Sequence, residues 1–266
     1  MATARVNGTD LYYEAVGSGP PLLMMHGTGL DHTYLRPWHD ELADRSRVIY
    51  YDQRWHGRSE RTGPADHATW IADAAGLLDH LGEHRATIYG HSYGAWLALA
   101  FAALHPECVS SLILCGASPA FDYADEVIAR AQARNPVAAS ALLEGMQVGV
   151  PTDAGLQQLW HDILPLYFHG EPRSDVLAAT RYSAPGFAHG MRCLEGFTMV
   201  GRLAELAMPI LVLVGRDDYI TPPSQAGRLA AEAPNATVVE LARSGHFPFV
   251  EEPAAYVDAI RAWWRP

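Results

Sequence analysis

A serine, an aspartate and a histidine each stand just after a predicted strand. Ser92 lies at the centre of Gly90-His91-Ser92-Tyr93-Gly94, a G-x-S-x-G pattern between a predicted strand and a predicted helix. Such a turn lifts a serine hydroxyl above a sheet, and its tight backbone requires small flanking residues. Since a serine hydroxyl is a weak nucleophile, it needs a base that a third group orients. The pattern predicts nucleophilic catalysis by Ser92.

Two later segments offer the base and the group that orients it. Asp218 ends a Gly-Arg-Asp-Asp loop and His246 lies in a Ser-Gly-His-Phe loop, each directly after an apolar strand. Because the carboxyl ends of parallel strands share one edge of a sheet, both loops are expected beside Ser92. We therefore assign His246 as the base and Asp218 as the acid.

The choice of acid has alternatives. In Gly-x-x-Asp loops of this type the acid is usually the last residue, which favours Asp218 and leaves Asp217 as a hydrogen-bonding loop residue. Asp122 follows the preceding strand and is the next candidate.

An oxyanion hole needs two backbone donors near the nucleophile. One is expected to be the N–H of Tyr93, directly after Ser92. The other is assigned to the N–H of Thr28, in a His26-Gly27-Thr28-Gly29 turn after an apolar strand.

Short apolar runs alternate with segments of helical period, which predicts an α/β fold with a mostly parallel sheet covered on both faces. The predicted buried strands are Leu22–His26, Arg47–Asp52, Ala86–Tyr89, Val109–Cys115, Ile210–Val214 and Thr237–Leu241. Apolar residues from Trp70 to Leu81 form one face of a predicted helix. An apolar helix is predicted over Gly94–Leu104, and another helix over Ala254–Trp264.

The alternation stops between residues 119 and 203, where the pattern becomes mostly helical. We interpret residues 1–118 and 204–266 as a core, and residues 119–203 as an inserted helical cap. The alternative is a set of ordinary helices packed under the sheet. Trp160, Tyr167 and Phe168 belong to an apolar stripe of the insertion, and either line a substrate entrance or pack the cap on the core.

Composition excludes several classes of function. The 266 residues carry a formal charge of −11, and all 19 basic residues are arginine. This negative net charge would repel a phosphate backbone or an anionic membrane surface. Three cysteines without C-x-x-C spacing indicate neither a disulfide framework nor a zinc site. Without 18 consecutive apolar residues or a signal peptide, we expect a cytoplasmic monomer or homodimer that acts on a small molecule without metal or cofactor.

The chain resembles the α/β-hydrolases from Asn7 to Trp264. Within them, Asp52-Gln53-Arg54 followed by Gly57-Arg58-Ser59 resembles the DQRGxGxS segment of prolyl aminopeptidases. The run from Ser244 to Pro253 is similar to their SGHxPxxEEP ending. The resemblance implies an α/β-hydrolase fold with a helical cap.

The chain departs from the aminopeptidases where they bind the amino group of the substrate. Gly196 stands where the resemblance would place a cap glutamate, and Tyr219 replaces the glutamate after the acid. Glu195 could take the place of the cap glutamate if the two sequences are aligned one residue differently. The oxyanion segment also lacks the HGGPG form. Burying an ammonium group without a carboxylate is costly, so an uncharged substrate is favoured.

These observations predict a serine hydrolase that cleaves carboxylic esters, or lactones or thioesters, of small apolar or aromatic acyl groups. A prolyl aminopeptidase is the main alternative. A cofactor-free dioxygenase and a small-molecule receptor with a slow triad are further alternatives on the same fold.

Overall fold

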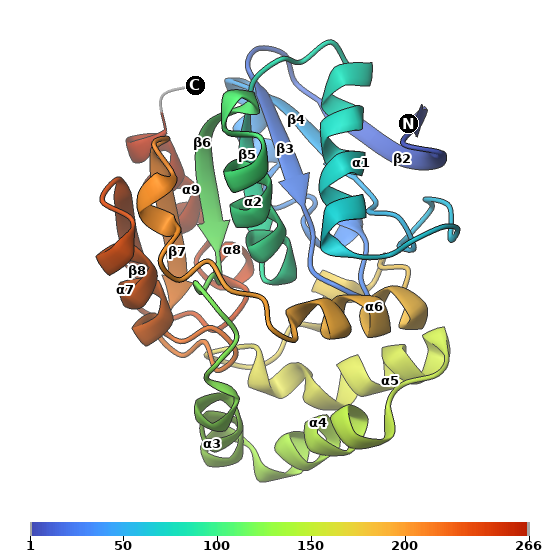
Figure 1. Cartoon of the computed structure of the whole chain (residues 1–266). Coiled ribbons are helices and arrows are strands. Elements are labelled where there is room, and N and C mark those ends of the chain that lie inside the picture. The colour runs from blue at the N-terminus through green and yellow to red at the C-terminus, as the bar shows by residue number, and fades with distance from the viewer. Residues whose placement is uncertain (1, 265–266) are drawn as a thin grey trace.

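The computed structural model describes residues 2–264, which form one eight-stranded sheet flanked by helices (Figure 1). The strand order is β1-β2-β4-β3-β5-β6-β7-β8, antiparallel from β1 to β4 and parallel from β4 to β8. The strands are β1 (Ala2–Val6), β2 (Thr9–Val16), β3 (Pro21–Met25), β4 (Arg47–Tyr51), β5 (Ala86–His91), β6 (Val109–Cys115), β7 (Ile210–Gly215) and β8 (Ala236–Leu241).

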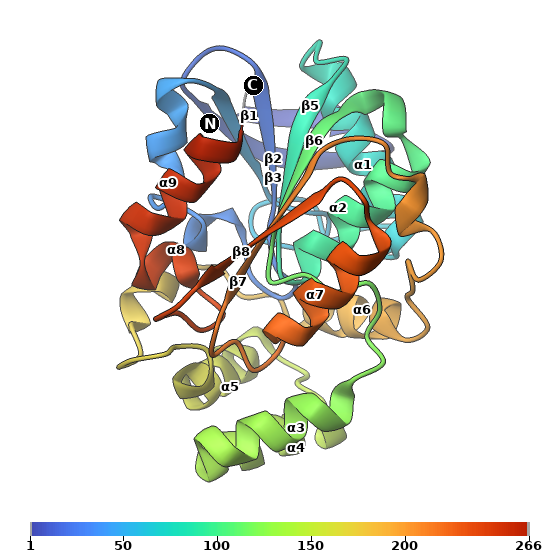
Figure 2. The same cartoon turned by 90° about the vertical axis from the view of Figure 1, so that its left-hand side faces the viewer.

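Helices cover both faces of the sheet, which explains why the central strands are apolar along their length. Figure 2 shows α1, α2 and α7 on one face and α8 and α9 on the other. Alternate residues of one strand join different cores: Leu112 and Leu114 pack on the first face, Ile113 on the second. The helices are α1 (His67–His80), α2 (Tyr93–Leu104), α3 (Ala124–Arg134), α4 (Pro136–Val148), α5 (Asp153–Ile163), α6 (Ala184–Leu194), α7 (Pro223–Glu232), α8 (Pro248–Glu251) and α9 (Pro253–Trp263).

Helices α3 to α6 come between β6 and β7 in the chain, and they lie beyond the carboxyl ends of the strands (Figures 1 and 2). Side-chain caps begin several of them. Asn135 accepts hydrogen bonds at the start of α4, Thr152 at the start of α5 and Ser183 at the start of α6. Such caps satisfy amide groups that a helix leaves unpaired. Capping residues in the local sequence therefore fix where these helices begin, and the helices form a layer beyond the carboxyl ends of the strands.

All six predicted strands are present, with ends that differ by at most two residues. Two findings differ from the sequence prediction. The hairpin of β1 and β2 was not predicted, although its turn at Asn7-Gly8 has the positive φ angles typical of that dipeptide. The burial predicted for the last strand is wrong, because β8 is at the sheet edge and Thr237, Val238 and Glu240 are exposed.

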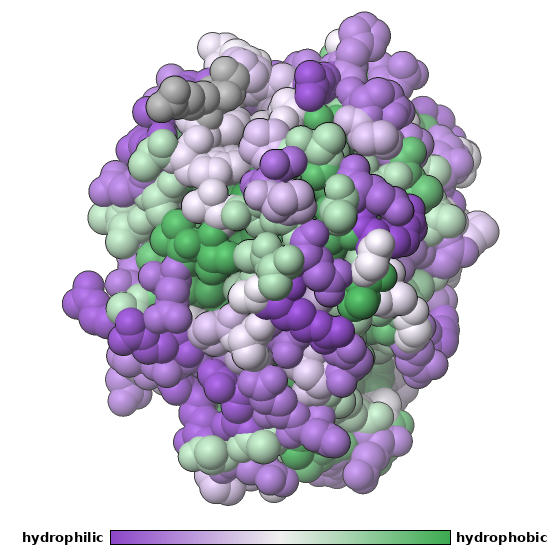
Figure 3. All heavy atoms as spheres, turned by 60° about the vertical axis from the view of Figure 1, so that its left-hand side comes forward, coloured by the Kyte–Doolittle hydropathy of each residue, from purple (hydrophilic) through white to green (hydrophobic). Residues whose placement is uncertain are grey.

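No helix within residues 2–264 is long and apolar enough to cross a membrane. On the face drawn in Figure 3, hydrophilic residues surround smaller apolar patches.

Candidate active site

Ser92 sits on a strained turn between β5 and α2. Its φ of 56° and ψ of −124° are unusual for a residue with a side chain. The two glycines of the pattern allow this turn to pack. A Cβ at Gly90 would lie 2.3 Å from the carbonyl oxygen of Gly94, and one at Gly94 would lie 2.1 Å from that of Met25. Both positions therefore exclude any larger residue.

His246 and Asp218 form a buried hydrogen-bonded pair. His246 Nδ1 lies 2.7 Å from Asp218 Oδ2, and each residue is 1% exposed. The carboxylate also accepts hydrogen bonds from the amides of Ile220 and Thr221 and from the Thr221 hydroxyl. Since these three donors use Asp218 as an acceptor, His246 Nδ1 is placed to donate to it as a fourth.

The second nitrogen of His246 is available for chemistry. His246 Nε2 is buried and has no hydrogen-bond partner within residues 2–264. Ser92 and His246 line the same cavity. The imidazole thus presents Nε2, the nitrogen that is not bonded to Asp218, to the cavity that Ser92 also lines.

The other two aspartates considered as the acid have different partners. The Asp217 side chain is hydrogen-bonded to His169, and the Asp217 amide donates to the carbonyl oxygen of Ser244. Asp122 is exposed and forms a two-pronged ion pair with Arg228, at 2.6 and 2.8 Å.

The two expected oxyanion donors line the cavity with Ser92. Gly27, Thr28 and Tyr93 all contribute to its wall. The amide of Gly27 donates to the Tyr34 hydroxyl at 2.7 Å, whereas those of Thr28 and Tyr93 have no partner in the described part of the chain. The amides of Thr28 and Tyr93, which the sequence singled out, are therefore unpaired within residues 2–264 and available as donors.

The cavity encloses about 80 Å³ and is lined mainly by apolar side chains. Trp160 and Tyr167 contribute, with ring centroids 4.8 Å apart. Phe168 does not line it; it is fully buried against Phe247, so its predicted place at a substrate entrance is wrong. The apolar lining residues that the sequence did not single out are Leu30, Trp96, Phe121, Phe187, Met191, Leu194, Ile220 and Phe247.

A family model described as the alpha/beta hydrolase family matches residues 22–259. The chain belongs to the α/β-hydrolase family. A pimeloyl-[acyl-carrier protein] methyl ester esterase of Chromobacterium violaceum is 31% identical over 94% of this chain and 96% of its own. A proline iminopeptidase of Lactiplantibacillus plantarum is 29% identical over 97% of each chain.

Solved structures have the same fold. The esterase from Thermogutta terrifontis has a TM-score of 0.73 and 29% identity, over 98% of this chain and 97% of that one. The enol-lactonase from Burkholderia xenovorans has a TM-score of 0.79 and 24% identity, over 98% of each chain. The mostly parallel sheet of this α/β-hydrolase and its helices on both faces are therefore those of its relatives.

Within residues 2–264, no carboxylate lines the cavity of this α/β-hydrolase. Glu195 is exposed at the end of α6, and Gly196 follows it at the surface. Tyr219 is buried and packs on Tyr167 without lining the cavity. Glu195 therefore does not take the place of an amine-binding glutamate.

The two glutamates of the SGHxPxxEEP segment hold the loop that carries His246. Glu251 accepts hydrogen bonds from the amides of Gly245, His169 and Gly170. Glu252 accepts from the Ser244 hydroxyl and the Arg243 amide, each at 2.7 Å. These contacts fasten the loop to α8 and to the segment before η5 (Ser174–Leu177).

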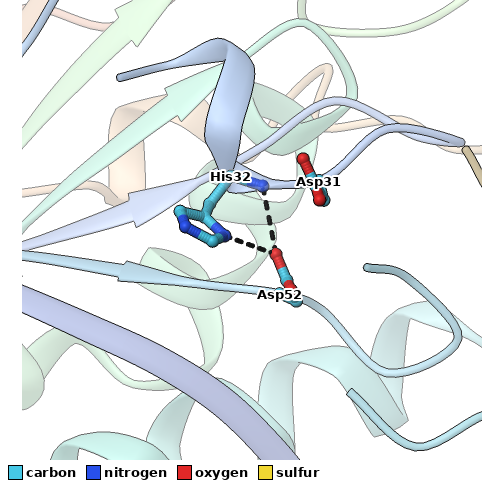
Figure 4. A group of neighbouring side chains, drawn as sticks. All are labelled: Asp31, His32 and Asp52. Carbon is cyan, nitrogen blue, oxygen red and sulfur yellow. Dashed lines mark hydrogen bonds and ion pairs between the residues drawn. The ribbon is translucent and has the colours of Figure 1, made fainter. Parts of the chain in front are cut away.

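A cluster of Asp31, His32 and Asp52 has donor groups that could hold a cation (Figure 4). Asp52 instead accepts from the amide and ring of His32 and from the amide of Arg58. Asp31 accepts from Thr33 and from the Arg181 amide. Since all four carboxylate oxygens have protein donors, we assign the cluster to joining the loops after β3 and β4.

Proposed function

We propose that this α/β-hydrolase is a serine hydrolase that cleaves neutral carboxylic esters of small apolar or aromatic acyl groups. The observation that carries the proposal is the free Nε2 of His246 in one small apolar cavity with the strained Ser92. Strain of this kind at a residue in a cavity is typical of a reacting group.

The reaction would begin when Ser92 Oγ attacks the ester carbonyl. His246 Nε2 takes the hydroxyl proton, and Asp218 stabilises the imidazolium that forms. The proton then passes to the leaving alcohol, and the acyl group stays on Ser92. Water, activated by the same imidazole, releases the acid and restores the serine.

The amides of Thr28 and Tyr93 would bind the oxygen that becomes negative during each step. One well-placed donor of this kind contributes about 3–4 kcal/mol to transition-state stabilisation. Tyr93 also begins α2, so the amino end of that helix favours the same charge.

Substrate charge and size follow from the cavity wall. It carries neither a carboxylate for an ammonium group nor an arginine for an acid group within the described residues. Burying either charge without a partner would be costly. A volume of about 80 Å³ favours a short or flat acyl group, and a lactone or thioester of that size would react by the same steps.

Residues 119–203 would act as the cap of this site, since Trp160, Tyr167, Phe187 and Met191 close the cavity from that segment. A prolyl aminopeptidase is the alternative, supported by the DQR segment and by the proline iminopeptidase relative. The missing carboxylate counts against it.

A substrate panel tests the proposal. We expect p-nitrophenyl acetate and butyrate to be cleaved faster than proline p-nitroanilide, and a fluorophosphonate to label Ser92. Ser92→Ala should abolish turnover and labelling, whereas Ser140→Ala, at an exposed serine of α4, should change neither. Faster cleavage of the anilide would establish the aminopeptidase instead. A fast first turnover followed by tight product retention would indicate a receptor with a slow triad.

A further inference from the structure

Two buried side chains outside the proposed triad connect the three loops of the site. The amide of Gly27 donates to the Tyr34 hydroxyl at 2.7 Å, and this hydroxyl lies 2.8 Å from His91 Nδ1. His91 Nε2 lies 2.9 Å from the carbonyl oxygen of His246. Tyr34, His91 and His246 are at most 2% exposed.

The direction of every hydrogen bond in this series follows from its two ends. The His246 carbonyl can only accept, so His91 Nε2 carries a proton. Burial lowers the pKa of His91 well below its usual value, so the ring is neutral and its Nδ1 accepts. The Tyr34 hydroxyl therefore donates to His91 while its oxygen accepts from Gly27. The series runs from Gly27 to His246 without an unpaired group.

Each end of the series meets a reacting part of the site. Gly27 precedes Thr28, whose amide is a proposed oxyanion donor, and a Cβ at Gly27 would lie 3.2 Å from the Tyr34 oxygen. His91 precedes Ser92 and its ring packs on the His246 ring, with centroids 4.8 Å apart. The backbones of the oxyanion loop, nucleophile and base are thus tied through two side chains.

We propose that Tyr34 and His91 are positioning residues that act as one unit, holding the Gly27-Thr28 backbone and the His246 backbone in register with Ser92. The inference rests on the proposed function of Ser92 and His246. If one hydroxyl or imidazole is removed, buried partners are left unsatisfied and the loops shift to pair them. A shift of about 1 Å near reacting atoms can reduce a rate roughly a hundredfold.

Tyr34→Phe is the most direct test, because it removes one oxygen and keeps the ring. We expect kcat on p-nitrophenyl butyrate to fall by roughly tenfold or more, with KM near that of the wild type and the protein still folded, because oxyanion contacts act in the transition state. Tyr51→Phe is the matched control. Its buried hydroxyl has no partner in the described part of the chain, so the control should keep its kcat.

His91→Phe and the double variant test whether the two residues act together. If they do, the kcat of the double variant should be about that of the less active single variant. If they act independently, the two fold-losses should multiply. His91→Gln, whose amide can still donate to the His246 carbonyl, should retain more kcat than His91→Phe and serves if the latter does not fold.

The rate of Ser92 labelling by a fluorophosphonate separates this inference from the proposed function. Labelling uses the same nucleophile and base, so Tyr34→Phe should slow it even if esters prove not to be the substrate. The inference is overturned if Tyr34→Phe reacts within about twofold of the wild type in both assays, or if the two losses multiply. A wild-type protein that is labelled at Ser92 but cleaves no ester counts against the proposed substrate alone.

Discussion

Gly190 faces Thr28 so closely that a Cβ on it would lie 2.2 Å from Thr28 Oγ1. The Thr28 hydroxyl donates to the carbonyl oxygen of Gly186, one turn earlier in α6, at 3.1 Å. A Cβ at Gly186 would in turn lie 2.6 Å from His56 Nε2. Helix α6 therefore rests directly on the loop that carries a proposed oxyanion donor, and the position of this loop depends on the helix.

Gly190→Ala should displace Thr28 and lower kcat by roughly tenfold or more, because a small misplacement near reacting atoms is costly. Gly227→Ala, on α7, is the matched control since nothing lies within 4 Å of its added Cβ. That change should leave kcat unchanged and raise stability by about 0.5–1 kcal/mol. Ester kinetics and melting temperatures distinguish them. An equal kcat in the two variants would show that α6 moves to accommodate the added methyl group without displacing the loop.

Asp218→Asn should reduce kcat by about 10⁴-fold, because an amide no longer holds the productive form of His246. Asp122→Asn should leave kcat within about twofold, since an exposed ion pair contributes only about 0–1 kcal/mol. Steady-state ester hydrolysis at one pH measures both. A severe loss in Asp122→Asn, with Asp218→Asn active, would transfer the acid role to Asp122.

Gly94→Ala should destabilise the fold as well as the site. The added Cβ would meet the backbone of Met25 in the adjacent strand, which cannot move away as a flexible side chain could. Overpacking of this kind costs about 1–3 kcal/mol. Urea denaturation should show a lower midpoint for Gly94→Ala than for Gly227→Ala, and an unchanged midpoint would contradict the close contact.

Stability should fall as the pH falls below about 6.5, the ordinary histidine value. Burial lowers the pKa of His26, His39 and His67 to about 4 and that of His56 to about 3. The unfolded chain binds protons in this range and the folded chain does not. The contribution is therefore fully present above pH 6.5 and is lost progressively towards pH 4, by up to about 1.4 kcal/mol per pH unit for each histidine.

Urea midpoints between pH 7.5 and 4.5 measure this loss. Replacing one buried histidine, as in His39→Gln, should reduce the slope of the unfolding free energy against pH. A flat profile in the wild type would show that these imidazoles are charged in the folded state.

The central strands could be predicted from the sequence because burial on both faces makes them apolar over their whole length. Strand β6 begins and ends at the predicted residues, Val109 and Cys115. The first hairpin was harder to predict, since β2 is buried only at Thr9, Leu11 and Tyr12 and is partly buried or exposed from Tyr13 to Val16. Its Asn7-Gly8 turn was the available signal.

The proposed triad could be predicted because local patterns carry it, a glycine-flanked serine and two loops after apolar strands. Tyr34 could not, because its role comes from a contact with His91 across 57 positions of the chain. The same limit applies to Phe168. Its apolar stripe indicated burial, but the pattern does not distinguish a cavity wall from a packed core beneath it.

Strands β6 and β7 are hydrogen-bonded neighbours, although residues 116–209 lie between them in the chain. A chain still on the ribosome with only residues 1–115 exposed already has Ser92 and Thr28, but lacks the loops of Asp218 and His246. Closing so long a loop has an entropic cost, so this pairing is expected late in folding. The rate at which catalytic activity returns during refolding would therefore report when β7 and β8 dock on the rest of the sheet.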